Sequence, residues 1–94
     1  METKHTKGKW VISCNQNLYS TIKNEHGVRI AEVKSYEGLN FNDASLDERK
    51  ANEKLISSAP ELLEALIELY ESLPDGYKHK CLPKVRKAIK KATN

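Results

Sequence analysis

The chain has 94 residues, of which 31% are charged and 38% hydrophobic, and a net charge of +3. This length predicts one domain, residues 1–94, with a modest core, and the aliphatic content excludes intrinsic disorder. Two cysteines, Cys14 and Cys81, are too few for a disulfide framework, and the sequence contains neither a membrane-span pattern nor a signal-peptide pattern, so we expect a soluble cytoplasmic protein with reduced thiols.

The first half of the chain, about residues 9–35, has the pattern of a three-stranded antiparallel β-meander. Apolar residues alternate from Trp10 to Cys14, and the strand-like segments 18–22 and 28–33 each follow a polar turn sequence, at 15–17 and 24–27. Gly27 can adopt the positive φ that closes the second hairpin. Because so small a sheet is not stable alone, we expect the second half of the chain to cover one of its faces.

The connection to the helical half, residues 36–43, contains Leu39 and Phe41, which we expect to reach the core. Ser45 and Glu48 form a capping-box pattern, so a first helix should begin at about Leu46. Its apolar side, which we expect to face the sheet, carries Ala51, Leu55, Ile56 and Ala59, while charged residues including Arg49 and Glu53 should point elsewhere.

Pro60 predicts an interruption of this helix, because proline lacks an amide hydrogen and disfavours a helical residue before it. Ser58 and Glu61 suggest a fresh helix start at that point. The second helix carries a broad apolar stripe of Leu62, Leu63, Leu66, Ile67, Tyr70 and Leu73, with Leu69 outside it, and an acidic stripe of Glu61, Glu64, Glu68 and Glu71. The segment 73–76 then ends it.

A third helix follows Pro83, with apolar residues at Val85, Ala88, Ile89 and Ala92 and a basic set at Lys84, Arg86, Lys87, Lys90 and Lys91. The predicted fold is therefore α+β, with a three-stranded antiparallel meander followed by three α-helices over about residues 46–93, the first two joined at a proline kink.

Three ordered motifs resemble a family of small phage and prophage proteins. They are the opening His5–Trp10, which is similar to H-T-P-G-P-W; the strand Ile30–Val33; and the stretch Ala51–Leu66, which is similar to A-N-A-x-L-I-A-A-A-P-E-L-L-x-A-L. Lys7 and Lys9 stand where proline is usual in that family, and Ser57–Ser58 replaces an alanine pair. The resemblance implies an origin in a phage or prophage and transfers no catalytic residue.

The residue pattern contains no recognisable catalytic or metal site, so we expect a protein that is not an enzyme and uses no cofactor. His79 and Cys81 are good zinc ligands, but the other candidates, Cys14, His5 and His26, are scattered without ligand spacing. No nucleophile elbow or phosphate-binding glycine loop is present.

The charged and apolar surfaces of the helices leave several interpretations open. The basic set, with Lys78 and Lys80 before it, could bind nucleic acid or an acidic protein, line a seam with the acidic stripe, or simply face water. No aromatic residue interleaves the lysines for base stacking. The apolar circumference of the second helix exceeds what covering a three-stranded sheet requires, which is consistent with core packing, a partner site or a homodimer.

These features predict a phage or prophage accessory protein that binds a host protein in the bacterial cytoplasm, as an inhibitor of an anti-phage defence system in the manner of an anti-CRISPR protein. The candidate partner-binding residues are the acidic stripe and the basic set. The alternative is a small basic nucleic-acid-binding protein that uses its last helix.

Overall fold

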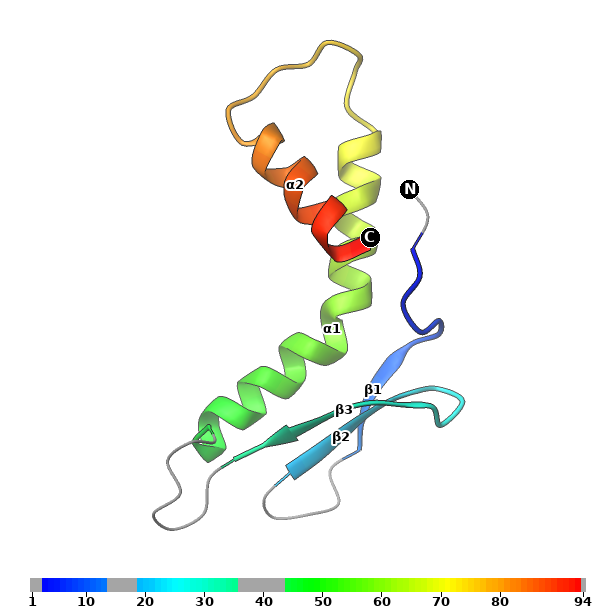
Figure 1. Cartoon of the computed structure of the whole chain (residues 1–94), viewed down its shortest axis with the longest axis vertical. Helices are drawn as coiled ribbons and strands as arrows, with labels where there is room; N and C mark the ends of the chain where they lie inside the picture. Colours follow the sequence, from blue (N-terminus) through cyan, green and yellow to red (C-terminus); the bar gives the residue numbers. More distant parts are fainter. Residues whose placement is uncertain (1–2, 14–18, 36–43, 94) are drawn as a thin grey trace. The chain divides into compact units, whose positions relative to one another are not determined.

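The computed structural model describes residues 3–13, 19–35 and 44–93. These residues form, in chain order (Figure 1), β1 (Trp10–Ser13), β2 (Tyr19–Asn24), β3 (Arg29–Lys34), α1 (Leu46–Glu71) and α2 (Leu82–Thr93). The predicted α+β class, with a three-stranded antiparallel sheet preceding helices, is confirmed. The chain divides into two compact units: the sheet unit, Thr6–Pro60, and the helical unit, Glu61–Asn94 with Met1–His5.

The sheet has the order β1-β2-β3, and both pairs of neighbouring strands are antiparallel. Ile22 lies opposite Ile12 on β1 and Ala31 on β3, and its side chain is completely buried. Gly27, at φ 87°, occupies the left-handed region between β2 and β3 as predicted. Strand β2 therefore forms the centre of the sheet unit.

Asn24, at the end of β2, ties the β2–β3 turn to the N-terminal segment. Its Oδ1 accepts hydrogen bonds from the amides of His26 (3.0 Å) and Val28 (2.8 Å), and its Nδ2 donates to the carbonyl oxygen of Lys7 (3.0 Å). The side chain is buried, and a buried amide is stable only when its polar atoms are bonded. Asn24 thus fixes the path of the chain before β1.

The opening motif contributes to the same arrangement. The indole Nε1 of Trp10 donates to the carbonyl oxygen of Thr6 at 3.0 Å. Gly8 has φ 91°, and a Cβ at this position would lie 3.1 Å from Oε1 of Glu25. A side chain at residue 8 would therefore be strained and crowded. The motif residues Thr6, Gly8 and Trp10 have structural roles in the sheet unit.

Helix α1 begins at Leu46 with the predicted capping box. The amide of Glu48 donates to Oγ of Ser45 at 3.2 Å, and Oε1 of Glu48 accepts from the Ser45 amide at 3.3 Å and from its hydroxyl at 2.8 Å. The Ser45 hydroxyl and the Glu48 carboxylate thus accept hydrogen bonds from backbone amides that have no acceptor within the helix.

The predicted division of this helix at Pro60 is wrong: α1 is one helix from Leu46 to Glu71 with Pro60 inside it, so the described part of the chain has two helices and not three. Proline costs about 3 kcal/mol in a helix interior. The flanking residues Ala59, Glu61 and Leu62 all favour helix, which helps α1 continue. The boundary between the two units nevertheless falls directly after Pro60.

The predicted apolar face of the first half of α1 is also wrong. Arg49 and Glu53 are buried, at 4% and 9% exposure, while Leu55 is 62% exposed. Ala51 and Ala59 are exposed too, and only Ile56 is partly buried. A buried hydrogen bond accompanies the burial of Arg49: its Nη1 donates to Oγ of Ser35, the residue directly after β3, at 3.3 Å. Within the sheet unit the helix turns a polar side inward.

In the helical unit, α2 runs alongside the second half of α1 (Figure 1). Among the described residues of this unit, the buried apolar side chains are Ile67 on α1 and Ile89 on α2. Nε of Arg86 donates to the hydroxyl of Tyr70 at 2.9 Å and joins the two helices. The predicted last helix is confirmed, with Pro83 in its first turn.

Some sequence predictions fall on residues 14–18 and 36–43, outside the described part of the chain. They concern Cys14, the turn at 15–17, and the core positions of Leu39 and Phe41.

Candidate functional site

The two helices of the helical unit face each other through one row of side chains on each helix. Residues spaced by four and three positions share one side of a helix. On α1, the row with Leu63, Ile67 and Tyr70 faces α2, because Ile67 is buried and Tyr70 bonds Arg86. On α2, the row with Leu82, Arg86 and Ile89 faces α1, because Ile89 is buried and Arg86 bonds Tyr70.

The next rows on each helix border an apolar groove, which we call the leucine groove. Its cavity of about 290 Å³ is lined from α1 by Leu66, Leu69 and Tyr70 and from α2 by Leu82 and Val85, and the connection between the helices completes the lining with Leu73, Tyr77, His79 and Cys81. Leu69 is 62% exposed and Leu62, one turn before Leu66 in the same row, is 55% exposed. The predicted surplus of apolar surface on this helix is therefore present.

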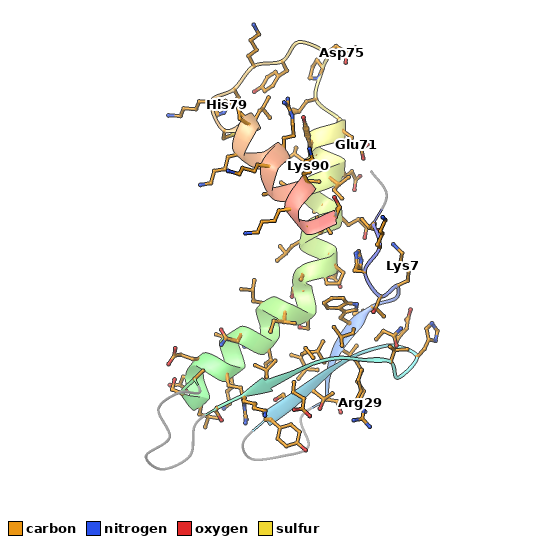
Figure 2. The ribbon with its side chains drawn as sticks, viewed as in Figure 1. Lys7, Arg29, Glu71, Asp75, His79 and Lys90 are labelled. Carbon is orange, nitrogen blue, oxygen red and sulfur yellow. The ribbon has the colours of Figure 1, made fainter. Side chains whose placement is uncertain are left out.

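A second, larger hollow of about 440 Å³, the basic hollow, lies where the α1–α2 connection enters α2. It is lined by Tyr77, Lys78, His79, Lys80, Leu82, Pro83 and Arg86. Tyr77 is 49% exposed, and every lysine of the lining is exposed. Lys90 follows Arg86 by one turn, and Figure 2 labels it on α2 together with His79 in the connection.

The structure places the predicted basic set on two sides of α2. Arg86 lines the basic hollow, and Lys90 shares a helix row with Pro83, which also lines it. Lys84, Lys87 and Lys91 form a different row, on the side of α2 that faces away from α1. All five side chains are exposed.

The predicted acidic stripe, Glu61, Glu64, Glu68 and Glu71, is exposed along its whole length. Within the residues that the structure describes, Glu61, Glu64 and Glu68 form no ion pair with the basic residues of α2. The seam of opposite charges that the sequence left open is therefore not formed by these three glutamates, which face solvent.

Tyr77 is the candidate binding residue that the sequence reasoning missed. The sequence shows no aromatic residue among the lysines of α2, but Tyr77 directly precedes the basic run and the structure places it beside Lys78, Lys80 and Arg86. The sequence did contain a signal for this site, because Tyr77 lies between the turn residues 74–76 and the lysines that begin at Lys78. Tyrosine and arginine are the residue types most often enriched in binding hot spots.

His79 has a local structural role. Its Nδ1 accepts a hydrogen bond from the amide of Cys81 at 3.2 Å, just before α2 begins, and Cys81 is exposed. Over residues 3–13, 19–35 and 44–93, no three histidine, cysteine, aspartate or glutamate side chains gather in a way that could hold a metal ion. The same residues contain no helix that is long and apolar enough to cross a membrane.

Comparison with protein families gives one result that covers the whole chain. The family model described as Salmonella phage P22 protein Y8K6 matches residues 1–94. No curated protein matches the chain, and no solved structure does. The expected origin among small phage proteins is therefore confirmed, and the chain belongs to the phage P22 protein Y8K6 family.

Proposed function

We propose that this phage protein is not an enzyme and acts by binding a host protein that presents an acidic surface, with the basic hollow as its contact site. The observation that carries the proposal is the combination, in one concave place, of an exposed tyrosine with Lys78, Lys80 and Arg86. Within the described residues these cations have no acidic counterpart in ion-pair contact.

Physical chemistry favours such a surface for recognition. Tyrosine offers a large contact area and loses little conformational entropy on binding, and arginine forms planar two-point hydrogen bonds with carboxylates. The surrounding lysines raise the rate of association with an acidic partner and make that rate sensitive to salt. Each of these contributions needs an exposed site, which the basic hollow provides.

Membership of a phage protein family indicates where this binding takes place. A phage protein is synthesised inside the infected bacterium, so we place the binding event in the host cytoplasm. Inhibition of an anti-phage defence complex, in the manner of an anti-CRISPR protein, is the role that we infer, because occupying one essential surface of a host complex requires binding and no chemistry.

The test is a charge reversal in the basic hollow with a matched control. Lys78→Glu/Lys80→Glu changes the two exposed lysines that line the candidate site, and Lys50→Glu/Lys54→Glu makes the same change in net charge at exposed positions of α1 in the sheet unit. We expect the first variant to bind the captured host protein at least about tenfold more weakly, and the control to bind like the wild type. Equal binding by both variants would contradict the proposal.

Nucleic-acid binding by the same surface is the second candidate, favoured by the placement of Tyr77 where a base could stack among cations. The two candidates differ in a salt series. Binding to nucleic acid must weaken steeply with salt, because each neutralised phosphate releases counterions. No mobility shift of DNA or RNA at low salt eliminates this candidate, and capture of the host protein that survives nuclease treatment supports the first one.

A further inference from the structure

The leucine groove has an apolar row on each helix, and the two rows have the same spacing. On α1 it consists of Leu62, Leu66 and Leu69, followed after the helix end by Leu73, and on α2 of Val85, Ala88 and Ala92, preceded just before the helix by Cys81; both sets repeat at steps of four, three and four. Leu66, Leu69, Leu73, Cys81 and Val85 line one cavity, so both rows face the same groove. This spacing is that of the core positions of helices in bundles.

Few apolar side chains of the helical unit are buried, and large ones beside the groove are exposed. In its described residues the buried apolar side chains are Ile67 and Ile89, both from the rows that join α1 to α2. Leu62 and Leu69 remain more than half exposed. Two helices joined in this way form half of a four-helix bundle, whose central positions are open.

Charge on the outer rows indicates what covers the groove. On the side of α1 away from α2 lies the row of Glu61, Ala65 and Glu68, and on the side of α2 away from α1 lies the row of Lys84, Lys87 and Lys91. One flank of the groove is therefore acidic and the other basic. A surface of this kind is complementary to a second copy of itself.

We propose that two copies of this chain associate through their leucine grooves into a four-helix bundle with a two-fold axis along the bundle. Each α1 then lies beside its own α2 on one side and the partner's α2 on the other, so that Glu68 approaches Lys84 of the partner subunit and Glu61 approaches Lys91 of the partner subunit. Leu62 and Leu69 enter the centre, opposite the small residues Ala88 and Ala92.

The charges also select this arrangement over the other two-fold arrangement. Turning one copy about an axis perpendicular to the bundle would place α1 beside the partner's α1. The acidic rows would then face each other, as would the basic rows, and like charges at close range are unfavourable.

The dimer goes beyond the proposed function and is compatible with it. Tyr77, His79 and Leu82 line both the leucine groove and the basic hollow, whereas Lys78, Lys80, Pro83 and Arg86 line the basic hollow alone. The cationic side of the basic hollow therefore lies outside the groove that the dimer covers. A dimer would present two such hollows, and a host complex with repeated subunits would be bound with higher avidity.

The first test is the mass of the full chain in solution, measured by sedimentation equilibrium. The wild type should have twice the monomer mass of 10.7 kDa. Leu69→Glu should raise the dissociation constant at least about a hundredfold, because the change occurs twice per dimer at a central position. Leu55→Glu is the matched control: the same residue type on the same helix, with the same exposure of 62%, but in the sheet unit. A monomeric wild type, or equal effects of both variants, would overturn the proposal.

The second test leaves the apolar residues unchanged, so it does not depend on whether Leu69→Glu folds. Glu61→Lys/Glu68→Lys alone and Lys84→Glu/Lys91→Glu alone should each lose the dimer, because like charges then meet along the bundle. Mixing the two variants should restore a dimer with one copy of each, since every contact again joins opposite charges. Failure of the mixture to form this heterodimer would overturn the arrangement, whatever happens to host binding.

Discussion

Replacing Ile89 by alanine should lower the free energy of unfolding by about 2–5 kcal/mol, the range for removing a buried branched aliphatic side chain from a core. Ile89 has no exposed surface, and among the described residues of the helical unit Ile67 is the other apolar side chain that is buried. The removed methylene and methyl groups therefore leave a cavity that few neighbours can fill. We expect this to be the largest effect of any single substitution in α2.

The measurement is urea denaturation combined with amide hydrogen exchange. Protection should fall first in α2 and in residues 61–71 of α1, because these segments form the helical unit with Ile89. Lys90→Gly, at the exposed position next to Ile89, provides the control and should cost about 1 kcal/mol from helix propensity. An Ile89→Ala variant that loses no more than this control would show that Ile89 does not form the core of the unit.

Asn24→Ala should destabilise the sheet unit by about 2–3 kcal/mol, given about 1 kcal/mol for each of the three hydrogen bonds of the Asn24 side chain. The loss should exceed that of an ordinary surface hydrogen bond, because Asn24 is 6% exposed. The partly buried amide of Val28 would lose its side-chain acceptor, and the Lys7 carbonyl its side-chain donor.

Thermal unfolding of Asn24→Ala beside Asn52→Ala measures this effect. Asn52 is exposed on α1, so the same chemical change there should be neutral or slightly stabilising through helix propensity. In the Asn24 variant, proteolysis should cut first near residue 7, where the N-terminal segment loses its attachment to the turn. Identical melting of the two variants would contradict the structural role that we assign to the opening motif.

The sequence predicted best the features that depend on neighbouring residues. Ser45 and Glu48 lie three positions apart, and their capping bonds form within one helical turn. Gly27 closes a hairpin between strands that are adjacent in the chain. Such features need no information about distant parts of the molecule, so residue type and spacing are sufficient.

The errors arose where distant parts of the chain decide the outcome. The apolar pattern of Leu55 and Ile56 favoured one face of α1, but the helix buries Arg49 and Glu53, and Arg49 bonds Ser35, which is distant in the sequence. Pro60 has a strong local preference against the helix interior, but the helix formers on both sides of it continue α1. Local preference is a weak guide where tertiary contacts or neighbouring helix formers oppose it.

The candidate site was predicted in part. The exposed positions of Glu61, Glu64, Glu68 and the basic set follow from helical periodicity and charge. The division of the basic set between a hollow and an outer row, and the place of Tyr77 in that hollow, required the conformation of the connection between α1 and α2. That connection has no periodic pattern from which its path could be deduced.

The most direct test of the proposed binding surface is lysine acetylation of the protein, alone and in complex with its host partner, read out by mass spectrometry. The chain carries lysines in both units, so each experiment contains its own control. Our account predicts that Lys78 and Lys80 become protected in the complex while Lys23, Lys34 and Lys50 react as before. Protection of the sheet-unit lysines with unchanged reactivity around the basic hollow would contradict it.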